Sequence, residues 1–181
     1  MFDLAQELIE IIKNNSIETA LDLWAGRGLW TNFLANHWVT TTAVDNQSMP
    51  MRAFDEVLLQ NSHITFLPQN IEQYVQETDQ TFDLVLLLNV IVFIPKSIFL
   101  ETILPKIIEA IQTNWYLVIS FFFADDKTMQ WPKSHFYSFE DFDFLSKHFE
   151  ITHKENIRTE DNHKPHGSHQ HHIGYLIARK K

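Results

Sequence analysis

Apolar segments of two kinds alternate along most of the chain. From Phe2 to Ile12 the apolar side chains recur three and four residues apart, which predicts an amphipathic helix. Continuous or β-branched apolar runs predict five strands, at 18–25, 39–44, 64–67, 82–88 and 115–122. Helical patterns separate them at 29–36, 51–59 and 98–111, and the last contains Pro105, where we expect a kink. Strands that alternate with helices are typical of a parallel sheet with helices on both faces.

The last part of the chain has a different pattern. Ser138-Phe-Glu-Asp141 resembles a capping box and predicts a helix to about Phe149. Ile151–Arg158 and Ile173–Ala178 then predict two strands with no helix between them, and therefore an antiparallel hairpin joined by a histidine-rich turn. We predict an α/β fold with a doubly wound, seven-stranded, mostly parallel sheet and an antiparallel C-terminal hairpin. Residues 1–181 are expected to form one domain.

A glycine-containing turn follows the first predicted strand. Gly26 and Gly28 stand between that strand and a predicted helix, where glycine permits positive φ and lets the backbone approach a ligand closely. In open α/β sheets, ligands bind at the carboxyl ends of the strands. Asp45 ends the second strand 19 residues after Gly26, close to the spacing at which an acid binds the ribose of a dinucleotide. A turn-capping role is the alternative for Asp45. These positions indicate a nucleoside cofactor without identifying it.

The segment from Leu21 to Gly28, LDLWAGRG, resembles motif I of the class I S-adenosylmethionine-dependent methyltransferases. TAVDN at 42–46 looks like the second motif of that family, LPQNI at 67–71 occupies the adenine-binding place, and FDLV through Asn89 matches the fourth strand. The end of the chain is similar to the tellurite-resistance branch of small methyltransferases. The dinucleotide fingerprint would require a third glycine, but position 31 is Thr.

The resemblance implies a doubly wound Rossmann-like fold, S-adenosylmethionine as the cofactor and methyl transfer to a small-molecule acceptor. It also implies a set of cofactor-binding residues: Asp22, Trp24, Gly26, Gly28, Asp45, Asn46, Asn70, Ile71 and Asn89. Trp24 stands where the family usually has a glycine, and Asn114-Trp115 replaces a common Gly-Gly pair.

Composition and charge narrow the classes of partner. The 23 acidic and 14 basic residues give a formal net charge of −9, which argues against a general nucleic-acid binder because phosphate neutralisation needs clustered Lys and Arg. The chain has no cysteine, which excludes disulfides and thiolate chemistry. No apolar run reaches the roughly 20 residues that span a bilayer, and the N-terminal segment lacks the pattern of a signal peptide. We therefore expect a cytoplasmic protein with no nucleic-acid or membrane partner. The sequence does not indicate an oligomeric state.

The predicted turn of the hairpin carries five histidines between positions 163 and 172. A turn between the sixth and seventh strands should lie at the cofactor edge of the sheet, so His166, His169 and His171 are candidate catalytic bases. The cluster could also bind a metal or metalloid or be an ordinary polar loop, and we assign no metal ligand from the sequence.

Two other functions remain open from the sequence. A short NAD-binding oxidoreductase would share the first glycine turn and the acid of the second strand. A non-catalytic module that binds S-adenosylmethionine or a metal would share the fold and the histidine cluster.

Overall fold

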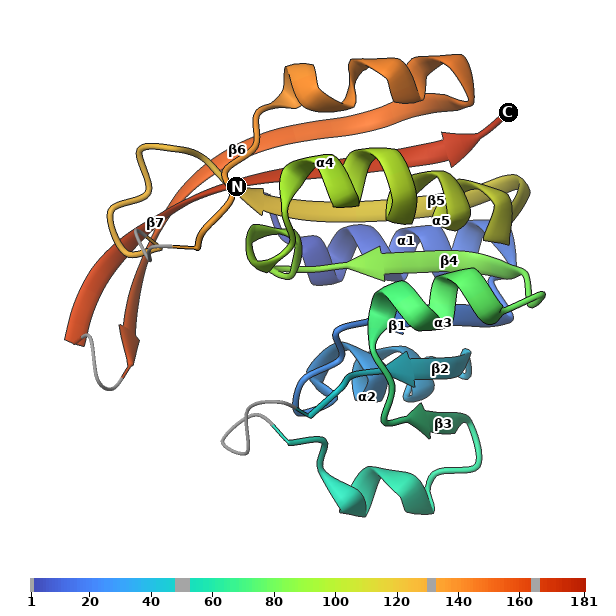
Figure 1. The fold of residues 1–181 in the computed structure, drawn as a ribbon. Helices are drawn as coiled ribbons and strands as arrows, with labels where there is room; N and C mark the ends of the chain where they lie inside the picture. Colours follow the sequence, from blue (N-terminus) through green and yellow to red (C-terminus); the bar gives the residue numbers. More distant parts are fainter. Residues whose placement is uncertain (1, 48–52, 130–132, 164–166) are drawn as a thin grey trace.

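The computed structural model describes residues 2–47, 53–129, 133–163 and 167–181, with the backbone alone at 161–163. The described residues form one sheet with the strand order β3-β2-β1-β4-β5-β7-β6 (Figure 1). The strands are β1 (Thr19–Leu23), β2 (Thr40–Val44), β3 (Ile64–Leu67), β4 (Phe82–Leu87), β5 (Ile111–Phe122), β6 (Phe149–His163) and β7 (Gly167–Lys180). Neighbours from β3 to β5 pair in parallel, and β7 pairs antiparallel with both β5 and β6. The predicted fold class is confirmed.

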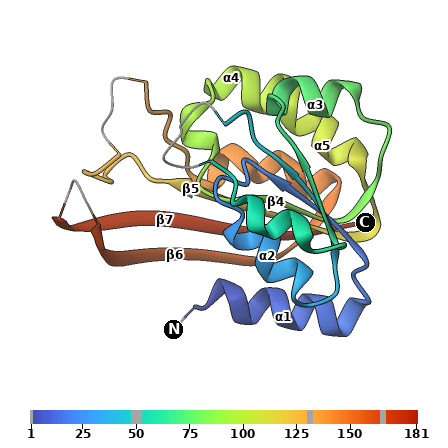
Figure 2. The ribbon, with the colours of Figure 1, turned by 90° about the horizontal axis from the view of Figure 1, so that it is seen from below.

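Helices cover both faces of the sheet (Figure 2). The helical segments are α1 (Leu4–Asn15), α2 (Leu29–Ala35), η2 (Glu56–Gln60), α3 (Ile71–Glu77), η3 (Ile91–Phe93), α4 (Lys96–Ile98), η4 (Phe99–Ile103), α5 (Leu104–Ala110) and η5 (Phe139–Lys147). Here η2, η3 and η5 are 3₁₀ helices and η4 is a π-helix. One core cluster lies between the sheet and the face with α3, α5 and η5, and a second lies against α1 and α2. This arrangement accounts for the fully apolar sequence of β4, which is buried throughout.

Three helical predictions need correction. The sequence analysis missed α3, although Asn70 caps it and Ile71, Tyr74 and Val75 bury one face. The helix expected at 51–59 is only the short 3₁₀ segment η2, with residues 51 and 52 outside the described part. The helix expected to follow Ser138 is also 3₁₀, and the Asp141 carboxylate accepts from the Ser138 N–H at 2.9 Å. Short segments packed between longer elements form these tighter turns readily.

The segment around Pro105 changes helix type, and the kink expected there stays a prediction. The π-helical segment η4 ends at Ile103, and α5 begins at Leu104 with Pro105 in its first turn. Proline lacks a backbone N–H, so it fits best where the first N–H groups of a helix have no intrahelical partner.

The C-terminal hairpin is longer than predicted and projects beyond the rest of the sheet (Figure 1). β5 ends at Phe122, which pairs with Ile173, whereas β6 and β7 continue pairing out to His163 and Gly167. His169, His171 and His172 therefore belong to a strand and not to the turn. The last paired residues of the hairpin, His163 and Gly167, lie beyond the carboxyl end of β5, and the connection between them is outside the described residues. No helix in the described residues is long and apolar enough to cross a membrane.

Candidate functional site

The carboxyl ends of β1 and β2 are joined by backbone hydrogen bonds just above the sheet. The Trp24 N–H donates to the Val44 carbonyl oxygen at 2.7 Å, and the Ala25 N–H donates to the same oxygen at 3.2 Å. Gly26 follows with φ +54°, and a Cβ built there meets no atom within 4 Å. The turn thus has the left-handed conformation that favours glycine, and the space beside Gly26 is open to a ligand.

Asp45 connects this turn to the end of β2. The Gly26 N–H donates to Asp45 Oδ2 at 2.9 Å, and the Gln47 N–H donates to Asp45 Oδ1 at 2.6 Å. A carboxylate oxygen has two lone pairs, so each oxygen can still accept one hydroxyl proton. The turn-capping role and the ribose-binding role considered for Asp45 are therefore compatible in one side chain.

A groove of about 240 Å³, open to solvent, runs along this edge of the sheet. Four of the predicted cofactor-binding residues line it: Trp24, Asn46, Asn70 and Ile71. Its other walls are Glu72 of α3 and residues of the segment after β4, namely Phe93, Ile94, Pro95, Ile98 and Ile103. Seven of its ten lining residues are apolar and three are polar, the mixture that small-molecule sites show. We call this the carboxyl-edge groove.

Trp24 forms an aromatic wall of this groove. Its φ is +68°, in the left-handed region that favours glycine. A non-glycine residue in this region costs about 1–2 kcal/mol. The Trp24 ring stacks on Phe93 with centroids 5.7 Å apart and planes inclined by 13°. This pair presents a flat apolar surface to the groove.

Asn70 was predicted to accept a hydrogen bond from adenine. Its side-chain oxygen already accepts from the Glu72 and Gln73 N–H groups at 2.8 and 3.4 Å, as the N-cap of α3. Both lone pairs of that oxygen are therefore engaged, but the side chain is exposed and its amide N–H groups remain to donate to a ligand beside the groove.

Asp22 lies beneath the turn and not in the groove. Its carboxylate accepts from the Thr31 hydroxyl of α2 at 2.6 Å, and the side chain is buried. Burial raises the pKa of Asp22 to about 6, and the nearby Asp45 charge adds to this, against the opposing effect of the Thr31 hydrogen bond. In this structure Asp22 joins β1 to the start of α2, and its predicted contact with the cofactor stays a prediction.

Gly28 is also set apart from the groove. It has φ +84° and precedes the first residue of α2, and a Cβ there would stand 2.6 Å from Leu58 Cδ1 and 2.7 Å from Phe54 Cε2. These two side chains cover Gly28, so close packing is sufficient to require glycine at this position. Its predicted role in cofactor binding likewise stays a prediction.

Asn89 stands just past the carboxyl end of β4 with φ +59°. Its N–H donates to the Ser120 hydroxyl oxygen at 2.7 Å, and that hydroxyl donates to Asn89 Oδ1 at 3.0 Å. The paired contacts hold the end of β4 against β5 and leave Asn89 exposed at the edge of the sheet.

The histidine candidates lie on the projecting hairpin. His169 Nε2 and His171 Nε2 are 3.1 Å apart, and His171 Nδ1 is 3.1 Å from Asp126 Oδ2. His169 and His171 contact the hairpin, the end of β5 and the segment after it, and neither lines the carboxyl-edge groove. His166 lies outside the described residues. The catalytic role of the three histidines stays a prediction.

Sequence reasoning missed the side of the groove that follows β4. Phe93, Ile94 and Pro95 lie in a short 3₁₀ turn and the residues after it, and Glu72 lies in the overlooked helix α3. The run from Val90 to Ile94 is as apolar as a buried strand, so its pattern did not distinguish a groove wall from core. Its position directly after β4 could have indicated a groove wall, because ligands bind beyond the carboxyl ends of parallel strands.

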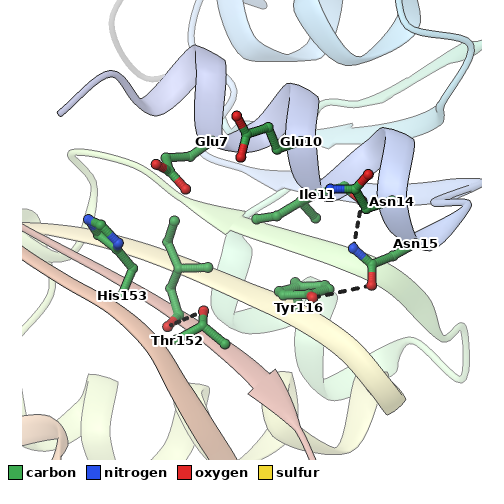
Figure 3. Close-up of a pocket in the computed structure, with 9 residues that line it drawn as sticks. Glu7, Glu10, Ile11, Asn14, Asn15, Tyr116, Thr152 and His153 are labelled. Atoms are coloured by element: carbon green, nitrogen blue, oxygen red, sulfur yellow. Dashed lines mark hydrogen bonds between the residues drawn. The ribbon is translucent and has the colours of Figure 1, made fainter.

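A second groove lies on the opposite face, between α1 and the base of the hairpin (Figure 3). Glu7 and Glu10 of α1 face it from one side, and Thr152 and His153 of β6 face it from the other (Figure 3). Asn15, at the end of α1, bonds Tyr116 across its far end at 3.3 Å. None of the cofactor-binding or catalytic residues predicted from the sequence lines this groove.

The strand order, the reversed last strand and the ligand groove at the carboxyl ends together define the fold as that of the class I methyltransferases. Solved structures show the likeness. TehB from Haemophilus influenzae superposes with a TM-score of 0.79 at 18% identity, over 97% of this chain and 62% of that one. The chain therefore spans less than two thirds of the length of TehB. The predicted resemblance to the tellurite-resistance branch is confirmed at the level of the fold.

Two further methyltransferases show the same fold. The N-methyltransferase NodS from Bradyrhizobium japonicum, crystallised with S-adenosylhomocysteine, has a TM-score of 0.73 at 15% identity, over 97% of this chain and 85% of NodS. Magnesium protoporphyrin IX methyltransferase from Synechocystis, also crystallised with S-adenosylhomocysteine, has a TM-score of 0.73 at 16% identity, over 98% and 80% of the two chains. No protein-family model matches the sequence, and no curated protein matches it.

Proposed function

We propose that this protein is an S-adenosylmethionine-dependent methyltransferase that acts on a small-molecule acceptor. The observation that carries the proposal is the carboxyl-edge groove, which brings Trp24, Asn46, Asn70 and Ile71 together next to Asp45 in a class I methyltransferase fold. Two of the structural neighbours described above, NodS and magnesium protoporphyrin IX methyltransferase, are methyltransferases that were crystallised with the demethylated cofactor.

The residues present fit a nucleoside cofactor. The Asp45 carboxylate lies at the end of β2 with one lone pair left on each oxygen, which suits the two hydroxyls of a ribose. Ile71 and the Trp24–Phe93 pair provide the apolar surfaces that a flat base and a thioether chain need. The open space beside Gly26 lets the cofactor lie against the backbone of the turn.

S-adenosylmethionine, when bound, supplies a methyl group on a sulfonium that is already activated toward a nucleophile. The protein's task is then to hold the donor in one position and to align the acceptor with it. Asp45 and Asn70 would fix the nucleoside, and Trp24 would restrict where the methionine end can lie because its ring is held by Phe93. Glu72 in the wall of the groove and Asp45 next to it also suit a cationic ligand.

Calorimetric titration with S-adenosylmethionine, S-adenosylhomocysteine and NAD⁺ tests this proposal. We expect one equivalent of each of the first two ligands to bind and NAD⁺ not to bind. Binding of NAD⁺ in preference to the sulfonium would instead favour the oxidoreductase. Transfer of a labelled methyl group to a panel of thiol, amine, hydroxyl and metalloid-oxyanion acceptors then separates an enzyme from a non-catalytic binding module.

A further inference from the structure

Two histidine rings converge on the α1 face of the hairpin, beyond the end of β5. His169 and His171 are two residues apart on β7, so their side chains leave the same face of the strand. Their Nε2 atoms are 3.1 Å apart, and their ring planes are nearly perpendicular, at 86°. Two ligands of a tetrahedral zinc ion at about 2.0–2.1 Å from the metal stand about 3.3 Å from each other. The observed separation is close to that value.

The other nitrogen of each ring is held by an oxygen that can only accept. His171 Nδ1 lies 3.1 Å from the Asp126 carboxylate, and His169 Nδ1 lies 2.8 Å from the Gly167 carbonyl oxygen. Both Nδ1 atoms must therefore carry hydrogen, which directs the lone pair of each neutral ring to Nε2. Histidines that ligate metals characteristically donate their remaining N–H to a carboxylate or to a backbone carbonyl. Here His171 has the carboxylate as its partner, and His169 has the backbone carbonyl.

Counting protons shows why a cation belongs between the rings. With hydrogen on both Nδ1 atoms, two neutral imidazoles would place two lone pairs against each other at 3.1 Å. The contact is attractive only if one added positive charge lies between the Nε2 atoms, either a shared proton or a metal ion.

The carboxylate that supports the pair is rigidly placed. The Asp126 side chain is fully buried. Its Oδ1 accepts from the Thr128 and Met129 N–H groups at 2.9 and 3.0 Å, and its Oδ2 accepts from the His172 N–H at 2.7 Å. The turn after β5 thereby fixes the orientation of the His171 ring. His169 is half-buried and the His171 side chain is 12% exposed, so an ion can reach the pair from solvent.

We propose that His169 and His171 form a two-histidine site for a divalent transition-metal ion such as Zn²⁺, which both Nε2 atoms ligate. The described residues contain no group of three or more metal-ligating side chains, so water or an external anion completes the coordination. The site is separate from the carboxyl-edge groove, and it does not depend on the proposed methyl transfer.

His172 provides a matched control on the same strand. Its ring faces the other side of the hairpin, where Nδ1 contacts Asp125, Nε2 contacts Asn156, and the ring stacks on Phe123 with centroids 4.3 Å apart. A variant at this position changes the histidine content by one, as His169→Gln and His171→Gln do, but leaves the converging pair intact. Asp126 thus holds the His171 ring on one face of the hairpin, and Asp125 holds the His172 ring on the other.

The test is a calorimetric titration of the chelator-treated, tag-free full chain with Zn²⁺ at pH 7.5. We expect one equivalent to bind, His169→Gln and His171→Gln each to weaken binding at least tenfold, and His172→Gln to change it less than threefold. Zn²⁺ should raise the unfolding temperature of the wild type and of His172→Gln but not of the other two variants. Circular dichroism of each metal-free variant verifies that it is folded.

A second pair of variants separates this site from the rest of the histidine-rich segment. His163→Gln with His166→Gln should leave binding within threefold of the wild type. The proposal is overturned if that double variant abolishes binding while His169→Gln with His171→Gln retains it. It is equally overturned if the wild type binds Zn²⁺ no better than the His169→Gln, His171→Gln chain, in which case the two rings share a proton only.

Discussion

At the scale of single residues, Asp45 is the position on which the cofactor assignment depends most. Its carboxylate joins the end of β2 to the glycine turn through the Gly26 N–H. Replacing it with alanine removes the ribose acceptors and one support of the turn. We expect Asp45→Ala to weaken S-adenosylmethionine and S-adenosylhomocysteine by about 1.5–3 kcal/mol, or about 10- to 150-fold, because the lost hydrogen bonds involve a charged acceptor.

Titration calorimetry of the folded variant measures this loss. Asp55→Ala is the matched control, because the Asp55 carboxylate also accepts a backbone N–H, that of Val57 at 3.1 Å, but caps η2 and not the Gly26 turn. Equal affinities of Asp45→Ala and the wild type would remove the ribose assignment.

Gly26 offers a second residue-scale test. Valine there would fill the open space beside the turn and oppose the φ of +54°. We expect Gly26→Val to remain folded and to lose detectable binding of S-adenosylhomocysteine. Gly167→Val is the control, because Gly167 has a similar φ of +66° and equally open surroundings but lies on the hairpin. If both variants bind like the wild type, the turn does not contact the cofactor.

Asp22 should leave a signature in the pH dependence of stability. Burial raises the pKa of Asp22 to about 6 in the folded protein, against 3.8 for an ordinary aspartate in the unfolded chain. The folded chain therefore holds this proton more tightly than the unfolded chain. The resulting stabilisation is complete below pH 3.8 and is lost as pH rises through 6. Asp22→Asn stays neutral and keeps an oxygen for the Thr31 hydroxyl. We expect its unfolding free energy, relative to the wild type, to rise by up to about 3 kcal/mol between pH 4 and 7.

Urea unfolding of the two proteins at pH 4, 5, 6 and 7 measures that difference directly. Taking the difference cancels the titration of the carboxylates that both proteins share. A difference that stays constant over this range would show that folding does not raise the pKa of Asp22.

At the scale of elements, the close contact of β5 with β7 is specified by one glycine. A Cβ at Gly174 would stand 2.3 Å from Phe121 Cζ, inside a buried aromatic cluster. We expect Gly174→Ala to destabilise the protein by about 1–3 kcal/mol, as overpacked cores do. Chemical denaturation measures this, and adding Phe121→Leu should recover part of the loss. No recovery in the double variant would show that the ring is not the obstacle.

The sequence was sufficient for the parallel part of the sheet but not for its connections. β4 is buried on both faces and therefore reads as an uninterrupted apolar run. α3 was missed because its seven residues show only one turn of the apolar pattern, Ile71, Tyr74 and Val75. The outer hairpin was underestimated because its far end is solvated on both faces, so Thr159 and Glu160 carry no strand-like alternation.

At the scale of the whole molecule, the order of the motifs predicted more than any single motif did. The first glycine turn, the acid after β2 and the residues before α3 come together because parallel strands end at one edge. The residues after β4 were not predicted to line the groove. Phe93 lies there because its ring packs on Trp24, a contact that the order of apolar and polar residues does not indicate. The distinction between Asp22 and Asp45 likewise needed coordinates, because both are acids at strand ends and only the fold directs one beneath the turn.

The most direct test of the central claim is a crystal structure of the chain with S-adenosylhomocysteine. We predict that the nucleoside lies in the carboxyl-edge groove, with its ribose hydroxyls on Asp45 and its adenine beside Asn70 and Ile71. The nucleoside in the groove between α1 and β6, or crystals grown at saturating ligand that contain none, would contradict the proposed cofactor site.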